Sequence, residues 1–551
     1  MGKKGPQVIP LNKEAALALP VDGPNPSGDA RWFPVAIPTD DNDVTAFINV
    51  LTEAYVEMGK VIALANGPAD FIYLLAWDVG LTASLNGTQL GTLLQQASNT
   101  RGVAIRAMLY LNQVPGASPL GSGPPPAPNN GPTVDFINAL TNGGAVHDNR
   151  YLDFGSHHQK LLVVKHGSTL TGFCGGMDIS PGRNNWHDVH LKIEGQGAFD
   201  LHQTFVDRWT DHPLTQVPSR ALVRTQLPPP PPRPPPGKPG TLKVQVVRTF
   251  GDGLKHSGLA DLDIPTVLTA GTLTPIQEPV VGLLQQAPST YAFASGGERG
   301  IFNLIVNSIS AAQRFIYLED QYLISEQPVA GGNSIAQRLA AKLTSADFQT
   351  LVILAARTES VNGELFQAWA RRRAFVQQLK AAAPAKVAVC QYKVIPGQAV
   401  DTNVPTYVHS KTWIFDDEFC IVSSANCNRR GYTHDSEVGA GVFDPNNDGN
   451  RLYFAHALRM RLWMKHLNPS GDPSITERDL LDPVAASRFW RTPLPISAIE
   501  AYDEFGDTRS PPAAPNVNAD RLLPLPLKSL TSQVLKNAQD EWDTLIDPDG
   551  A

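Results

Sequence analysis

The chain has 551 residues, of which 42% are hydrophobic and 18% are charged. This balance excludes a disordered protein, and the length allows two to four domains. A formal net charge of −7 disfavours a nonspecific binder of polyanions, although a local basic site is compatible with it.

The sequence offers no obvious membrane or disulfide signature. It has no run of 18 apolar residues, so we expect no transmembrane segment. The N-terminus lacks the apolar core of a cleaved secretory signal. Four cysteines without metal-binding or disulfide spacing are interpreted as small buried side chains: Cys174, Cys390, Cys420 and Cys427.

The first half of the chain alternates helix-like and strand-like patterns. Residues 1–40 are predicted to be a Pro-rich arm, and 41–226 the first of two repeats. Within this repeat the apolar spacing predicts a helix at 44–65, a strand at 71–77, a helix at 91–98, a strand at 103–110, a loop at 113–132 and a helix at 198–210.

A Pro-rich linker, 227–240, leads into the second predicted repeat, 241–470, and a C-terminal extension, 471–551. The predicted elements here are helices at 300–310, 334–343, 363–380, 450–467 and 530–545 and a strand at 350–356. The helix at 363–380 carries three consecutive arginines, 371–373, which we interpret as a solvated basic face.

The most informative stretch of the sequence is 407–437. Two short apolar runs flank the acidic residues 416–418, a pattern that predicts a strand, a tight turn and a second strand.

Residues two apart share one face of a strand, so His409 is expected beside Lys411, and Ser424 beside Asn426. An imidazole, an ammonium, a hydroxyl and an amide would then converge at adjoining strands. Such a group of side chains predicts a site for a phosphate.

A second copy of this pattern lies upstream. His158 and Lys160 begin another apolar run, and Asp188 follows His158 by 30 residues, much as Glu437 follows His409 by 28. The string Phe-Ile-Tyr-Leu occurs at 71–74 and again at 315–318. An internal duplication of this period predicts two domains rather than a solenoid.

These motifs resemble those of the phospholipase D superfamily, whose members carry two copies of H-x-K-x4-D. Further strings are similar to the true phospholipases D: Gly175-Gly176-Met177-Asp178, Gly182-Arg183, Trp186-His187-Asp188, Tyr317-Leu318-Glu319-Asp320-Gln321-Tyr322, and Leu458 to Trp463 with His466-Leu467. The resemblance implies an α/β fold in which two pseudo-twofold-related sandwich domains share one interfacial active site.

The resemblance also implies hydrolysis of a phosphodiester through a phosphohistidine. His158 would be the nucleophile and His409 the general acid, and the roles would reverse as water attacks. Asp188 and Glu437 would each orient an imidazole.

The remaining candidate residues would bind the phosphate. Lys160 and Lys411 would supply positive charge, and Ser424 and Asn426 hydrogen bonds. The first half has Gly175-Gly176 where the second has these polar side chains, so backbone amides are expected to take their place.

One departure from the family pattern is clear. The first motif ends at Lys165 where the family has Asp, whereas the second is intact at Asp416. Asp416 is an odd number of residues from His409, so a regular strand points it away from the His-Lys face. We interpret Asp416 as a structural residue.

No metal site or cofactor is predicted. Six histidines gather in and near the first motif, but without a Cys set or an H-E-x-x-H pattern: His147, His157, His158, His166, His187 and His190. The resemblance likewise implies a metal-independent mechanism.

The resemblance favours a glycerophospholipid substrate, cleaved to phosphatidic acid and the free headgroup, with transphosphatidylation to a primary alcohol. The expected partner is a phospholipid membrane surface, contacted peripherally by a monomer, and nucleic acid is not expected. The alternatives are a phosphodiesterase or nuclease of the same superfamily and a degenerate lipid-binding scaffold. A cytoplasmic enzyme and an effector exported without a cleaved signal, with an immunity or regulatory protein, both fit the sequence.

Overall fold

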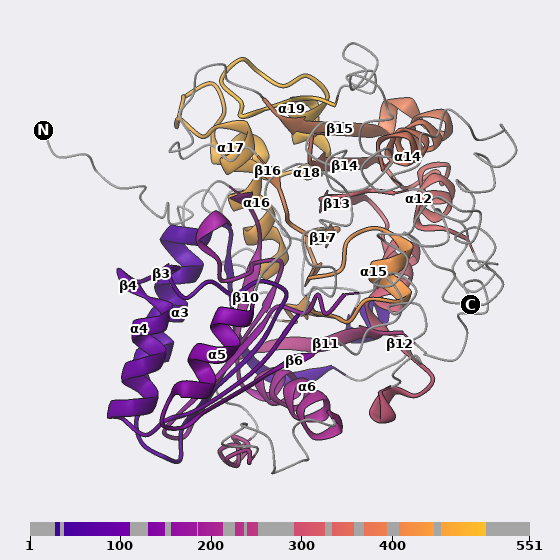
Figure 1. Ribbon diagram of the computed structural model, residues 1–551. Helices are drawn as coiled ribbons and strands as arrows, with labels where there is room; N and C mark the ends of the chain where they lie inside the picture. Colours follow the sequence, from indigo (N-terminus) through magenta and orange to yellow (C-terminus); the bar gives the residue numbers. More distant parts are fainter. Residues whose placement is uncertain are drawn as a thin grey trace, which may run out of the picture.

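The computed structural model describes residues 28–33, 38–110, 130–148, 156–183, 186–212, 226–235, 240–251, 291–324, 333–357, 368–393, 407–445 and 453–502. Within these ranges the chain has a mixed α/β fold built on one large sheet (Figure 1). Three expectations lie wholly or largely outside the described residues: the arm at 1–40, the loop at 113–132 and the helix at 530–545.

The described residues place sixteen strands in this sheet. The first half contributes β1 (Thr39–Phe47), β2 (Phe71–Ala76), β5 (Ala104–Tyr110), β6 (Gly143–Asp148), β7 (Leu161–His166), β8 (Thr169–Gly175) and β10 (His190–Glu194). The second half contributes β11 (Leu242–Phe250), β12 (Glu298–Arg299), β13 (Phe315–Asp320), β14 (Thr350–Ala355), β15 (Val387–Tyr392), β17 (Thr412–Phe415), β18 (Phe419–Ser423), β19 (Glu437–Phe443) and β20 (Ile499–Ala501). A separate two-stranded pair is formed by β3 (Ser84–Leu85) and β4 (Thr88–Gln89).

The strand order repeats in the two halves. From one edge to the centre it runs β6-β5-β2-β7-β8-β10-β1, and from the other side β15-β14-β13-β17-β18-β19-β11, with β20 added at that edge. The outer three strands are parallel in each series, and the inner ones are antiparallel. β1 and β11 pair antiparallel at the centre, so the two series form one continuous sheet.

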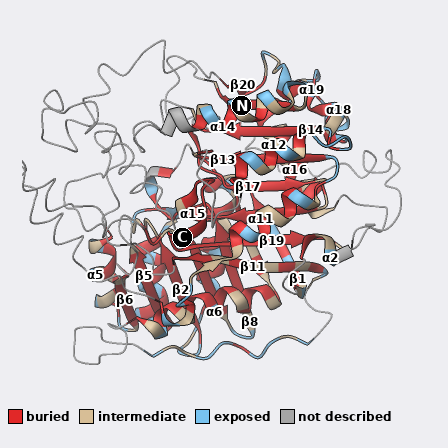
Figure 2. Cartoon of the chain, turned by 90° about the vertical axis from the view of Figure 1, so that its right-hand side faces the viewer, coloured by how far each residue is buried: buried red, intermediate tan, exposed pale blue. Residues whose placement is uncertain are grey.

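Helices cover both faces of this sheet (Figure 2). In the first half these are α2 (Gly28–Trp32), α3 (Tyr55–Leu64), α4 (Leu90–Gln95), α5 (Gly131–Ala139) and α6 (Gln196–Asp211). In the second they are α11 (Gly300–Ala311), α12 (Ile335–Leu343), α14 (Ala368–Ala382), α15 (Arg429–Thr433), α16 (Phe454–Leu467), α17 (Glu477–Leu480), α18 (Pro483–Ala486) and α19 (Arg488–Arg491).

The cores follow from the alternation of side chains along the strands. Phe71 and Tyr73 of β2 and Phe315 and Tyr317 of β13 point to the face that carries α6 and α16, in one core shared by both halves. On the opposite face, α3, α4 and α5 cover the first half and α11, α12 and α14 the second, each over its own core. The shared core therefore joins the halves.

Two sequence interpretations were wrong. The helix predicted at 44–65 begins only at Tyr55, after a short π-helical turn, because 39–47 is the central strand β1 with alternating burial. The arginine run is not a uniformly solvated face, since Arg372 is fully buried and donates to the carbonyls of Gln321, Tyr322 and Ala356. A buried Arg that binds three carbonyls fixes the segment that follows β13.

Asp416, in the turn after β17, and Lys165, near the end of β7, occupy equivalent positions of the two motifs but bind opposite groups. The carboxylate of Asp416 accepts the amides of residues 313–315 over 2.7–2.8 Å and pairs with Arg31. At the equivalent place in the first half, the ammonium of Lys165 donates to the carbonyl of Ala69 over 2.6 Å. Lys165 in place of Asp thus puts a donor to a carbonyl where the other half has an acceptor of amides. Neither side chain contacts the His-Lys pairs.

In the part of the chain that the structure describes, every helix is too short or too polar to cross a lipid bilayer.

Asp416→Ala removes the acceptor of three backbone amides and a partner of Arg31, so we expect the free energy of unfolding to fall by about 3 kcal/mol. Lys165→Ala removes a single donor and should cost about 1 kcal/mol. Chemical denaturation of both variants measures the difference, and an equal loss in the two would contradict the assignment.

Candidate active site

The backbone of one motif histidine is held by the opposite half of the chain. β16 (Tyr407–Val408) pairs in parallel with β9 (Trp186–His187). The amide of His409 continues this pairing and donates to the carbonyl of His187 over 2.8 Å.

The other motif histidine is held in the same way. His157 forms a bridge with Ser436, and the amide of His158 donates to the carbonyl of Ser436 over 3.0 Å. Each histidine is therefore anchored to the residue that directly precedes the carboxylate of the opposite half.

This anchoring aligns each imidazole with that carboxylate. Nδ1 of His409 lies 2.7 Å from Oδ2 of Asp188, and Nδ1 of His158 lies 2.9 and 3.0 Å from the two carboxylate oxygens of Glu437. The predicted carboxylates thus do meet the imidazoles, and they do so crosswise. Nδ1 is occupied in both rings, which leaves Nε2 as the nitrogen available for chemistry.

The two lysines are buried beside the histidines. Nζ of Lys160 donates to the carbonyl of His158 over 3.1 Å and lies 3.5 Å from the carboxylate of Asp178. Nζ of Lys411 donates to the carbonyl of His409 and, over 3.0 Å, to the side-chain oxygen of Gln321. Two buried cations thus belong to the site.

Burial sets the protonation states of these groups. Desolvation, assisted by the neighbouring lysines, holds the pKa of both His158 and His409 well below the usual value of 6.5. Desolvation raises the pKa of Asp188 and of Glu437 to about 7, and lowers the pKa of Lys411 to about 8. Both imidazoles are therefore neutral near pH 7.

Ser424 and Asn426, the predicted polar pair of the second half, have different surroundings. The hydroxyl of Ser424 donates to the carboxylate of Glu437 and accepts the amide of Val438, so it lies behind His158 and its proton is already committed. The side-chain oxygen of Asn426 is buried without a hydrogen-bond partner among the described residues. Asn426 is thus the member of the pair with capacity for a ligand.

The two glycines make room for a carboxylate. A Cβ on Gly176 would lie 2.0 Å from Oδ1 of Asp188, and Gly175 has a φ of +146° that other residues rarely adopt. The amide of Gly176 donates to the carbonyl of Val189 over 3.1 Å. This amide is therefore already bonded and does not offer the oxyanion contact that we expected from it.

Aromatic rings flank both histidines. The ring centroid of Trp186 lies 4.7 Å from that of His409, and Trp77 lies 6.2 Å from His158. The guanidinium of Arg183 stacks on Trp186 at 3.8 Å and lies 3.3 Å from Asp178. The site thus has an aromatic rim with a third, paired cation.

Several of these neighbours were absent from the predicted site. Trp77 and Gln321 each follow the repeated Phe-Ile-Tyr-Leu strand by the same interval, and each lies beside the lysine of its half. Extending the alignment of the two repeats past the strand would have identified both. Asp178 and Arg183 stood in the strings that carried the family resemblance.

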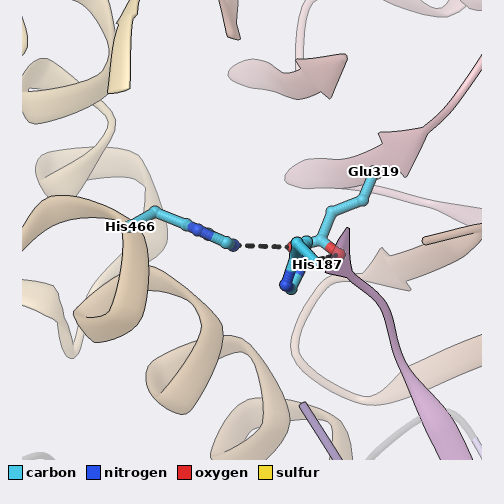
Figure 3. A group of neighbouring side chains, drawn as sticks. All are labelled: His187, Glu319 and His466. Carbon is cyan, nitrogen blue, oxygen red and sulfur yellow. Dashed lines mark hydrogen bonds and ion pairs between the residues drawn. The ribbon is translucent and has the colours of Figure 1, made fainter. Parts of the chain in front are cut away.

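Among the histidines considered for a metal, His187 joins a buried cluster with Glu319 and His466 (Figure 3). Among the described residues, this is the one group of three or more His, Cys, Asp and Glu side chains whose candidate ligand atoms all lie within 4.8 Å of one another. All four cysteines are free and buried, in agreement with their interpretation as small core residues.

Comparison with known proteins finds relatives of this chain. A family model described as phospholipase D matches residues 390–488, which include the second motif. The chain is 26% identical over 430 residues to phospholipase D alpha 1 of Zea mays, covering 59% of this chain and 50% of the relative. It is 25% identical over 434 residues to phospholipase D alpha 1 of Oryza sativa subsp. japonica, covering 60% and 51%.

The chain therefore spans about half the length of the curated relatives that it matches. Among solved structures, phosphatidylserine synthase of Haemophilus influenzae Rd KW20 superposes with a TM-score of 0.52 at 12% identity. That match covers 93% of this chain and 97% of the synthase, and it identifies a shared fold.

The protonation states can be tested directly. We expect His158 and His409 to titrate with midpoints well below 6.5, because burial disfavours the imidazolium ion. Spectra of 15N-histidine-labelled protein across pH, assigned with His158→Ala and His409→Ala, measure both midpoints. A midpoint at or above 6.5 for either ring would contradict the expectation.

Proposed function

We propose, since this chain belongs to the phospholipase D superfamily, that it hydrolyses phosphodiesters through a phosphohistidine. One observation carries the proposal: two imidazoles, each held at Nδ1 by the carboxylate of the opposite half, lie beside two buried lysines. A nucleophile, a proton donor and positive charge for the phosphoryl oxygens are then in one place.

The first step forms a bond between Nε2 of His158 and phosphorus while the bond from phosphorus to the leaving oxygen breaks. His409 gives the proton on its Nε2 to that oxygen. When the diester binds, its negative charge raises the pKa of His409 and allows this ring to carry the proton.

In the second step water attacks phosphorus as the bond to His158 breaks. His409 takes a proton from the water, which restores both rings. The products are a phosphomonoester and an alcohol. Glu437 and Asp188 hold the two rings in orientation throughout, and Lys160 and Lys411 bind the phosphoryl oxygens.

The proposed substrate is a glycerophospholipid, cleaved at the distal phosphodiester to phosphatidic acid and the free headgroup. Two features support this choice: the relatives in the comparisons are phospholipases D, and the first motif carries the Gly-Gly-Met-Asp and Trp-His-Asp strings. A primary alcohol in place of water would give transphosphatidylation. The intact His-Lys pairs and carboxylates speak against a degenerate scaffold.

The proposal is tested with phosphatidylcholine and phosphatidylethanolamine vesicles, a chelator and a primary alcohol. We expect phosphatidic acid and phosphatidylalcohol from the wild type, and at least a 1,000-fold loss in His158→Ala and in His409→Ala. Denaturation at alkaline pH during turnover of a slow substrate should leave the phosphatidyl group on His158, because a bond from phosphorus to imidazole is labile in acid.

Product formed equally by the wild type and both variants would overturn the proposal. Phosphate mapped to His409 would reverse the roles of the two histidines. Vesicle binding without product would favour the scaffold, and cleavage of single-stranded nucleic acid alone would favour the nuclease.

The pH dependence of kcat/KM should be bell-shaped. Below about 7 a protonated carboxyl at Glu437 donates to Nδ1 of His158 and forces the proton of that neutral ring onto Nε2, which blocks nucleophilic attack. Above about 8 Lys411 loses its charge and phosphate binding weakens. Initial rates across pH measure both limbs, and a flat profile between 6 and 9 would contradict these assignments.

A further inference from the structure

A second buried group of charges lies directly behind one of the two imidazoles. Glu319 of β13 accepts hydrogen bonds from Nε2 of His187 at 2.8 Å and from Nε2 of His466 at 2.9 Å (Figure 3). The hydroxyl of Tyr317 donates to the same carboxylate over 2.6 Å. The side chains of His187, Glu319 and His466 are fully buried, and so is Tyr317.

The partner on the far side of His187 fixes the tautomer of that ring. Nζ of Lys465 lies 2.9 Å from Nδ1 of His187, and the hydroxyl of Tyr392 lies 2.9 Å from Nδ1 of His466. An ammonium can only donate, so Nδ1 of His187 is an acceptor and its proton sits on Nε2, directed at Glu319. We call these six residues the Glu319 network: His187, Tyr317, Glu319, Tyr392, Lys465 and His466.

This arrangement favours a hydrogen-bonded network over a metal centre. A metal on Nε2 of His187 would need that nitrogen unprotonated, and the proton would then face the ammonium of Lys465. Metal-binding histidines instead direct the other ring nitrogen at an acceptor. Glu319 carries the negative charge of the network and Lys465 the positive charge. The two charges balance without an added ion.

The network connects to the catalytic centre through His187. The carbonyl of His187 anchors the amide of His409, and the residue after His187, Asp188, binds the imidazole of His409. The strings that contribute the network, Trp-His-Asp, Tyr-Leu-Glu-Asp-Gln-Tyr and the helix ending in His466-Leu467, are those that resemble phospholipases D. Their polar side chains meet behind Asp188.

The opposite half has a matched but different network. Arg208 of α6 donates to Asp148 at 2.7 and 2.9 Å, to Gln159 at 2.8 Å and to the hydroxyl of Ser436 at 2.6 Å. Ser436 anchors His158 as His187 anchors His409. One network therefore stands behind each imidazole.

We propose that Glu319 is a positioning residue that acts through His187 and Asp188 on proton transfer by His409. The inference rests on the proposed function, because it assigns to His409 the proton given to the leaving group. Disturbing Glu319 should then impair the protonation of the leaving oxygen while attack by His158 persists. Disturbing the Arg208 network should instead impair the attack by His158, because Ser436 of that network anchors the nucleophile.

Leaving groups of different basicity separate these effects. A choline alkoxide needs a proton to depart, whereas p-nitrophenolate departs without one. For Glu319→Gln we expect kcat/KM to fall about 100-fold on phosphatidylcholine and less than about fivefold on phosphatidyl-p-nitrophenol. Because His409 also activates water in the second step, this variant should release a stoichiometric burst of p-nitrophenol and accumulate phosphohistidine.

Two further variants keep the test decisive should Glu319→Gln fold poorly. Tyr317→Phe removes one donor to Glu319 and should show the same pattern with a loss of about tenfold on phosphatidylcholine. Ser436→Ala, the matched control in the Arg208 network, should lose activity by the same factor on both substrates and show no burst. Thermal melting of each variant confirms that the compared proteins are folded.

Equal losses on both substrates in Glu319→Gln and Tyr317→Phe, without a burst, would overturn the inference. One equivalent of bound zinc whose removal abolishes wild-type activity and whose return restores it would also overturn it. A wild type that cleaves neither substrate would overturn the proposed function and the inference together. If the wild type cleaves both substrates and Glu319→Gln shows the same dependence on the leaving group as the wild type, the inference alone is overturned.

Discussion

The crossed backbone pairing is the constraint on which the rest of the site depends. The amides of His158 and His409 are held by the carbonyls that directly precede Glu437 and Asp188, so each imidazole meets the carboxylate of the other half. Neither motif histidine is held by a carboxylate of its own half. The two imidazole–carboxylate pairs of the candidate site therefore form only when the central strands and the shared core have brought the halves together.

Buried charge is the recurring cost of this arrangement, and pairing offsets it. Lys160 and Lys411 are taken out of water, and each is met by carbonyl or carboxylate oxygen. Arg208 and Glu319 are also buried, and each forms hydrogen bonds with a residue of the other half. Isolated ions at such depth would neutralise themselves by shifting their pKa, whereas a paired network keeps them charged and fixed in position.

Much of the framework was predictable from the sequence, because side-chain periodicity is local. The two-residue period predicted the strands β17 and β18, and the duplicated strings predicted two similar halves. The expected strand geometry of the functional pairs was wrong, because His409 and Lys411 precede β17 and Ser424 and Asn426 follow β18. The crossing was not predictable, since Asp188 and Glu437 stand at similar distances downstream of their own histidines. The burial of Arg372 was missed because an arginine run looks alike whether it faces solvent or three backbone carbonyls.

The repeated strand order describes, within one chain, the geometry of two identical subunits that exchange carboxylates across a twofold axis. In an assembly of identical subunits every substitution appears twice, so neither copy of a site can change alone. Joining the copies in one chain removes that restriction. Lys165 opposite Asp416, and an arginine network opposite a glutamate network, are differences that only the joined chain can hold.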